Sequence, residues 1–156
     1  MLFVILVIII GLVAYLGFLY NEYVNLRSKI KEEWETIVKN ISERVTVTKE
    51  LQEANKELDF NYLELNDIMD KLGSITNKSE FVLEYQKYEE KLKELLVKVD
   101  NNQNISIINN LNNTNNKIEY IRNFYNDNVE TYNKKIDMFP TNVMAQICKF
   151  EKDVTI

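Results

Sequence analysis

An uncharged run of residues near the start of the chain limits most strongly what the chain can become. Residues 2–20 read LFVILVIIIGLVAYLGFLY and contain no charged side chain. As a helix, with a rise of 1.5 Å per residue, the run would be about 29 Å long, close to the roughly 30 Å hydrocarbon core of a bilayer. The run predicts a transmembrane anchor over residues 1–20, with the lipid bilayer as partner of residues 2–20.

A cleaved signal peptide is the competing interpretation of this run. Signal peptides carry basic residues ahead of an apolar stretch of about 7–15 residues and end at a small-residue cleavage site. Here the run is longer, no Lys or Arg precedes it, no such site closes it, and no lipoprotein-type Cys follows. We therefore predict an uncleaved anchor. Gly11, Ala14 and Gly17 could let two anchors pair, but Gly is also simply tolerated in membrane helices.

Basic residues set the expected orientation of this anchor. Arg27, Lys29 and Lys31 follow the run closely, and no basic side chain precedes it. Positive residues flanking a span favour the cytoplasmic side. We expect a single-pass protein of the cell membrane with its C-terminal domain in the cytoplasm.

Helix-breaking residues are scarce in the whole chain. The only glycines and proline are Gly11, Gly17, Gly73 and Pro140. A β-rich or α/β fold needs more turn residues than this, so the fold is expected to be all-α. Apolar residues recur at helical spacing in four segments joined by short polar stretches, which favours an antiparallel bundle. The predicted helices are the anchor continued to about residue 58, then 61–72, 81–99 and 105–138.

This pattern predicts an N-terminal transmembrane helix that continues into a long antiparallel four-helix bundle. The bundle is expected over residues 21–140 and a short tail over 141–156. Gly73 is the expected cap at the end of the second bundle segment, and Ser79 the expected cap at the start of the third. The expected inward-facing residues include Leu63, Ile68 and Leu72 and a heptad-like, coiled-coil seam through Tyr85, Tyr88, Leu92, Leu95 and Val99. In the tail, one or two amphipathic turns are expected, with an apolar side formed by Val143, Ile147 and Phe150.

The most regular segment is IEYIRNFYNDNVETYNKKIDMFP, residues 118–140. Its apolar positions are separated by steps of three and four, so one helix face carries all of them. A Tyr-Asn pair followed by Val or Ile occurs twice in it and once more at residues 20–24. The tyrosines are interpreted as half-buried boundary residues with solvated Asn neighbours; the alternative is that buried Asn side chains fix the helix register. The apolar positions are Ile118, Ile121, Tyr125, Val129, Tyr132, Ile136 and Phe139, and Pro140 ends the run.

The chemistry of the side chains excludes several classes of function. The chain has no His, and Cys148 is its one cysteine, so the commonest general base, the commonest transition-metal ligand and an intrachain disulfide are all excluded. Carboxylates such as Glu32 and Glu33 are interpreted as solvated. Basic residues are interleaved with Glu, which argues against a nucleic-acid footprint. No catalytic residue, cofactor or metal site is predicted.

A YNxxVxLR-like motif follows the anchor, a Trp stands seven residues on, and residues 122–140 show an R-x-x-YN-x-x-V-x-x-YN-x-x-I-x-x-FP signature. By these motifs the chain resembles the LemA family of bacterial membrane-anchored helical proteins. A Pro-containing family element is replaced here by residues 45–51, VTVTKEL. The residues that carry the resemblance, all predicted to be structural, are Tyr20, Asn21, Val24, Leu26, Arg27, Trp34, Arg122, Tyr125, Asn126, Val129, Tyr132, Asn133, Ile136, Phe139 and Pro140.

The resemblance implies a single-pass helical bundle but no particular activity. The favoured hypothesis is a non-enzymatic, membrane-tethered interaction or scaffold module with an unidentified protein partner, a second copy of itself included. One rival is an accessory subunit of a membrane enzyme, such as a membrane protease. Another is a hydrolase that uses carboxylates alone, which would need at least two acidic side chains converging in a pocket.

Overall fold

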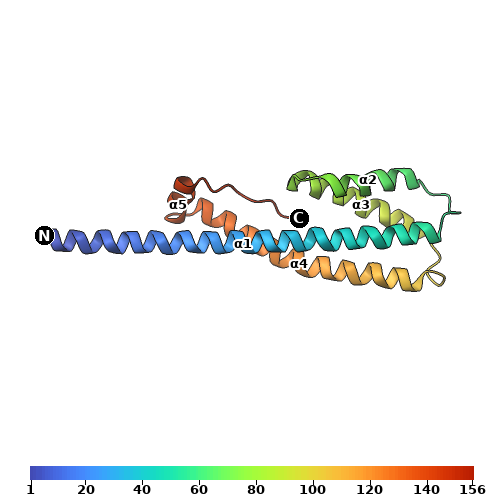
Figure 1. Cartoon of the computed structure of the whole chain (residues 1–156), viewed down its shortest axis with the longest axis horizontal. Helices are drawn as coiled ribbons and strands as arrows, with labels where there is room; N and C mark the ends of the chain where they lie inside the picture. The colour runs from blue at the N-terminus through green and yellow to red at the C-terminus, as the bar shows by residue number, and fades with distance from the viewer. The chain divides into compact units, whose positions relative to one another are not determined.

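The structure of the protein is a computed structural model that describes residues 1–156, and its regular secondary structure is entirely helical (Figure 1). The all-α prediction is confirmed. Four of the helices agree with the predicted segments to within a few residues, and a fifth forms in the segment that was expected to be a tail. The helices are α1 (Leu2–Ala54), α2 (Tyr62–Ser74), α3 (Lys78–Lys98), α4 (Ile105–Asp137) and α5 (Thr141–Cys148).

Helix α1 is unbroken over 53 residues. No Gly or Pro occurs between Phe18 and Ala54, so nothing in the sequence interrupts it after the apolar run. It ends somewhat short of the predicted residue 58. The side chains of residues 2–15 are all exposed. By length and composition, α1 is the one helix of the chain able to cross a membrane.

The chain divides into two compact units. Unit 1 consists of residues 1–35 and 123–155, and unit 2 consists of residues 36–122 together with Ile156. Helices α1 and α4 contribute to both units, α2 and α3 belong to unit 2, and α5 belongs to unit 1.

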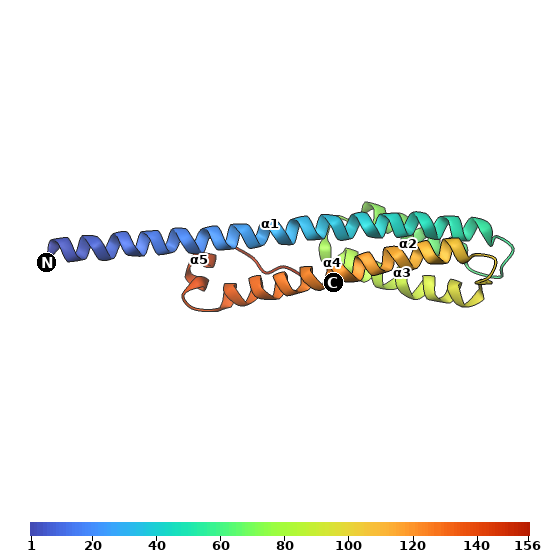
Figure 2. The ribbon, with the colours of Figure 1, turned by 90° about the horizontal axis from the view of Figure 1, so that it is seen from below.

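Unit 2 is a bundle of four helical segments: the second part of α1, α2, α3 and the first part of α4. Short loops connect consecutive segments, and such loops make neighbouring helices antiparallel. Figures 1 and 2 both show α2 and α3 running alongside this part of α1. Each segment contributes one apolar face to the core, including the predicted seam of α3. The buried side chains include Ile37, Ile41, Leu51, Leu65, Ile68, Met69, Leu72, Tyr85, Tyr88, Leu92, Leu95, Val99, Leu111 and Ile118.

Three local predictions in unit 2 are wrong. Gly73 does not cap α2, because the helix continues through it to Ser74, and the cap is Ile75, whose N–H bonds to the carbonyl of Lys71 at 3.1 Å. Ser79 does not cap α3. Asn77 does so, since its side chain accepts from the Glu80 N–H at 3.1 Å.

The third error concerns Leu63, which was expected in the core and is 83% exposed. The inward face of α2 runs through Leu65, Ile68, Met69 and Leu72. This is the spacing of three and four residues that one helix face requires, and Leu63 lies off that face.

Unit 1 packs the first part of α1 against the second part of α4, with α5 and the extended segment 149–155 completing it. Figures 1 and 2 both place α5 beside α1. The core contains Tyr23, Ile30, Tyr125, Val129 and Tyr132. The segment 141–155 is therefore packed on the helix pair rather than free.

The predictions for the inward face of α5 and for Phe139 are wrong. Helix α4 ends at Asp137, so its periodic face does not extend to Phe139, which is 81% exposed. Helix α5 then starts a new register after Pro140. Its buried residues are Met144 and Ala145, whereas the expected Val143 and Ile147 are exposed and Phe150 is half-buried.

Candidate functional site

The aromatic cluster of unit 1 gathers the rings of the family-like motifs. Tyr23 meets Tyr132 edge to face with ring centroids 5.9 Å apart, and it meets Phe150 at 5.1 Å. The Tyr23 hydroxyl donates to the Thr141 carbonyl at 3.2 Å. The pKa of Tyr23 is raised, and burial is the largest cause of this rise. The cluster thus joins α1, α4, α5 and the segment after α5 at one place.

A second pair of rings lies further along the same two helices. Trp34 packs against Tyr125 with centroids 5.7 Å apart. Tyr125 is fully buried, and burial strongly raises its pKa. Its hydroxyl donates to the Val154 carbonyl at 2.6 Å. Trp34 is half-buried.

Asn133 holds the C-terminal segment by two hydrogen bonds. Its Nδ2 donates to the Asp153 carbonyl at 2.9 Å, and its Oδ1 accepts from the Asp153 N–H at 2.9 Å. Together with the bond from Tyr125, these contacts form what we call the tail clamp: Tyr125 and Asn133 of α4 against the backbone of residues 153–154. The clamp uses the backbone of the segment, so it does not depend on which side chains the segment carries.

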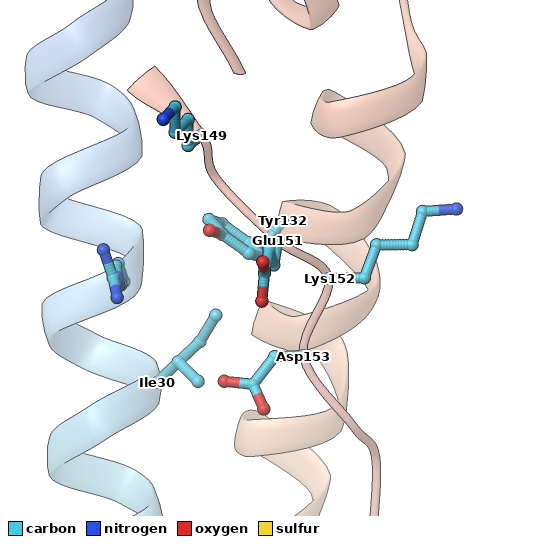
Figure 3. Close-up of a pocket in the computed structure, with 7 residues that line it drawn as sticks. Ile30, Tyr132, Lys149, Glu151, Lys152 and Asp153 are labelled. Carbon is cyan, nitrogen blue, oxygen red and sulfur yellow. The ribbon is translucent and has the colours of Figure 1, made fainter. Parts of the chain in front are cut away.

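A pocket of about 240 Å³ lies between α1, α4 and this segment (Figure 3). Its charges are mixed, because the basic Arg27 and Lys149 are matched by the acidic Glu151 and Asp153. Lys152 extends away from the pocket in Figure 3 and pairs with Asp137 at 2.8 Å. The remaining lining residues are Ile30 and Tyr132.

The structure brings most residues of the family-like motifs into unit 1. Arg122 is the exception, since it belongs to unit 2 and pairs with Glu119 at 3.3 Å. The guanidinium of Arg27 lies over the Phe150 ring, 6.0 Å from its centroid. Of the others, Val129 is buried, Leu26, Asn126, Ile136 and Pro140 are half-buried, and Tyr20, Asn21 and Val24 are exposed.

None of the three asparagines that follow a motif tyrosine is buried. Asn133 bonds to the tail rather than to α1. The amide that bridges the helix pair is instead Asn128, whose Nδ2 donates to both carboxylate oxygens of Glu33 at 2.8 and 3.0 Å. Sequence reasoning missed Asn128 because it does not follow a tyrosine, although it precedes the buried Val129.

Unit 2 contains a buried polar cluster that sequence reasoning also missed. Arg44 is 7% exposed; it donates to the Tyr85 hydroxyl at 3.0 Å and to the Glu89 carboxylate. Thr48 shares a hydrogen bond of 2.6 Å with the Tyr88 hydroxyl. A signal for this cluster was available in the sequence. Arg44 and Thr48 lie three and seven residues after the buried Ile41, which is the spacing of one helix face.

Burial dominates the electrostatics of these tyrosines. It raises the pKa of Tyr88 to about 12, and it raises that of Tyr85 further. The Arg44 charge and, for Tyr88, the bond from Thr48 act in the opposite direction but are outweighed. Both hydroxyls therefore act as neutral hydrogen-bonding groups over the ordinary pH range.

The described side chains form no group of three or more His, Cys, Asp or Glu residues that could hold a metal ion. Cys148 is half-buried and its thiol contacts the Met144 sulfur at 3.5 Å. Glu84 is buried and pairs with Lys87 at 2.8 Å. The aromatic cluster of unit 1 and the buried polar cluster of unit 2 hold helices and a chain segment in place.

The fold and these clusters define an all-α bundle protein with one helix able to cross a membrane. The LemA family model matches residues 19–155, so the chain belongs to the LemA family. That membership fits a non-enzymatic helical protein. Searches of curated proteins and of solved structures gave no significant match.

Proposed function

We propose that this protein is a non-enzymatic helical bundle tethered to the cell membrane by residues 2–20, and that it acts as an interaction or scaffold module with its C-terminal domain in the cytoplasm. The observation that carries the proposal is α1. This one helix contains both the exposed apolar run and the inward-facing stripe of the bundle. No glycine, proline or loop separates the anchor from the bundle, so the bundle is held at the membrane.

A groove in unit 2 supports the interaction role. It has a volume of about 210 Å³ and is lined by three helices and the loop between α2 and α3. Most of its lining is apolar, and the polar side chain among its lining residues is that of Ser42. A groove of this kind fits an apolar side chain of a protein partner. The lining residues are Val38, Ile41, Ser42, Val45, Met69, Leu72, Gly73, Ile75 and Phe81.

Membrane extraction tests the anchor. The full chain should stay with the membrane pellet after alkaline carbonate washing, whereas Ile9→Asp combined with Leu12→Asp should release it, because charges at the centre of a span are costly. Leu83→Asp, at an exposed apolar residue of α3, is the matched control and should stay in the pellet. Release of the unaltered chain by carbonate would contradict the proposal.

Photo-crosslinking in membranes tests the interaction role. A photoreactive side chain at Ile75, which lines the groove, should give a reproducible adduct with a defined protein or with a second copy of the chain. The same probe at the exposed Glu57 should not give that adduct. If the two positions crosslink identically, or neither crosslinks, the groove has no role as an interaction site.

A further inference from the structure

The turn and helix that follow α4 expose an unusual set of apolar side chains. Met138, Phe139 and Ile147 are 62%, 81% and 68% exposed, and Val143 is exposed as well. Residues 138–148 contain no charged side chain. Helix α5 buries Met144 and Ala145 on its inner side and leaves the apolar Val143 and Ile147 exposed, beside the uncharged Gln146. We call Met138, Phe139, Val143 and Ile147 the α4–α5 corner.

Direct contacts place this corner at the end of the apolar run of α1. Tyr20 stacks on Phe150 with centroids 6.4 Å apart, and Tyr23 bonds to Thr141, the first residue of α5. Lys135, in the last turn of α4, pairs with Glu22 at 2.7 Å. The corner is therefore fixed beside the residues that directly follow the run.

The burial of Leu19 shows that the soluble part reaches into the apolar run itself. Leu19 is 4% exposed, although residues 2–15 of the same run are all exposed. Both views of the chain place α5 beside α1 in this region (Figures 1 and 2). If residues 2–20 span the hydrocarbon core, Tyr23 lies about 4.5 Å beyond its edge, within the headgroup layer, which is roughly 5–7 Å thick.

We propose that the α4–α5 corner inserts into the headgroup and upper acyl region of the bilayer, as a second membrane contact beside the anchor. The proposal rests on the proposed anchoring by residues 2–20. Apolar side chains exposed at that level would otherwise face water or headgroups without covering. The neighbouring Lys149, which directly follows α5, is exposed and forms no ion pair, so one cation stands beside the corner, where it favours anionic headgroups.

Depth-dependent fluorescence quenching tests this contact. The full chain, with Cys148→Ser, is reconstituted into vesicles of phosphatidylcholine and phosphatidylglycerol, and an environment-sensitive dye is attached at Ile147→Cys or, separately, at Phe139→Cys. Both labels should lose fluorescence to lipids that carry the quencher near the headgroup, and less to lipids that carry it deep in the chain. Leu12→Cys, in the middle of the run, should show the reverse order.

Phe124→Cys is the matched control. Phe124 is also an exposed aromatic residue of α4 in unit 1, but it lies 14 residues before Met138, about 21 Å along the helix. Its label should not be quenched by either lipid. Quenching at Leu12 without quenching at Ile147 and Phe139 would overturn the second contact and leave the anchor intact.

Two other results would also be decisive. A blue-shifted label at Ile147 that no lipid quenches would mean that protein, such as a second copy of the chain, covers the corner. Absence of quenching at Leu12 would overturn the proposed anchor itself.

Discussion

Arg44 places a guanidinium in the interior of unit 2, where a charge is costly unless it is paired. Glu89 supplies the opposite charge and Tyr85 a hydroxyl. The Nε of Arg44 is buried without a hydrogen-bond partner. Both of these hydrogen bonds come from a single guanidinium nitrogen, Nη1, and the contribution of the cluster depends on both charges being present.

Breaking the Arg44–Glu89 pair should destabilise the bundle. Glu89→Gln should lower the free energy of unfolding by about 2 kcal/mol, because it leaves the buried cation without its counter-charge. Arg44→Met combined with Glu89→Gln should cost less than the sum of the two single changes. Denaturant unfolding of the full chain in detergent, followed by circular dichroism, measures all three variants. Strict additivity would show that the two groups do not interact.

The buried tyrosines predict a loss of stability at high pH. Burial raises the pKa of Tyr88 to about 12 in the folded chain, against about 10 when unfolded. The folded chain keeps the proton that the unfolded chain releases, so stability is constant below about pH 10 and falls as the pH rises towards 12. Tyr88 alone should account for about 1 kcal/mol by about pH 11.

Tyr88→Phe separates this effect from general alkaline damage. The variant loses the bond to Thr48 and should be less stable at neutral pH, but its free energy of unfolding should fall less between about pH 8 and about pH 11. Unfolding curves at the two pH values measure the difference. An equally steep fall in the variant would exclude Tyr88 as a source of the pH dependence.

At the scale of the elements, Gly73 distinguishes a helix interior from a helix cap. No glycine of the chain has a positive φ, and a Cβ on Gly73 would meet nothing within 4 Å. Gly73→Ala should therefore raise the free energy of unfolding by about 0.5–1 kcal/mol. Asn77→Ala should lower it by about 1 kcal/mol, because the α3 cap is lost. Thermal unfolding measures both, with Ser79→Ala as the nearly neutral control.

The tail clamp should control how often the C-terminal segment opens. Asn133→Ala removes two hydrogen bonds to Asp153, worth together roughly 1.5 kcal/mol, and should raise trypsin cleavage after Lys149 and Lys152 about tenfold if opening limits cleavage. Asn128→Ala is the control, since Asn128 bonds to Glu33 and not to the segment. Equal cleavage of both variants would show that the clamp does not hold the segment.

The helices were predictable and their ends were not, for identifiable physical reasons. A long run of apolar residues at helical spacing, such as that of α4, is enough by itself to predict a helix. By contrast, Asn77 and Ser79 are both good caps by residue type, and only the position of the helix axis decides between them. Tyr125 and Tyr132 were predicted on the apolar face of α4 but only as half-buried boundary residues, and this interpretation is wrong because both are buried. The bond from the Tyr125 hydroxyl to the Val154 carbonyl was not predicted, because hydrogen bonds to backbone atoms leave no pattern in side-chain sequence.

At the scale of the whole molecule, the net charge of −5 hides an uneven distribution of basic residues. Arg27, Lys29 and Lys31 come directly after the apolar run, while acidic residues, which contribute little to membrane orientation, are spread along the chain. The contacts of the α4–α5 corner add Lys135 and Lys149 near the same end of the run. Folding thus brings two more basic residues to that end of the run, of which Lys135 is paired with Glu22.

This concentration of charge predicts which side of the membrane the bundle occupies. Thr76→Cys, in the loop between α2 and α3 and in a Cys148→Ser background, should resist a membrane-impermeant maleimide in intact cells and react once the cells are permeabilised. Thr76 is exposed, so failure to react after permeabilisation would have no structural cause. The Cys148→Ser chain without the added cysteine gives the background. Labelling of Thr76→Cys in intact cells would place unit 2 outside, and the basic residues after the run would then not set its orientation.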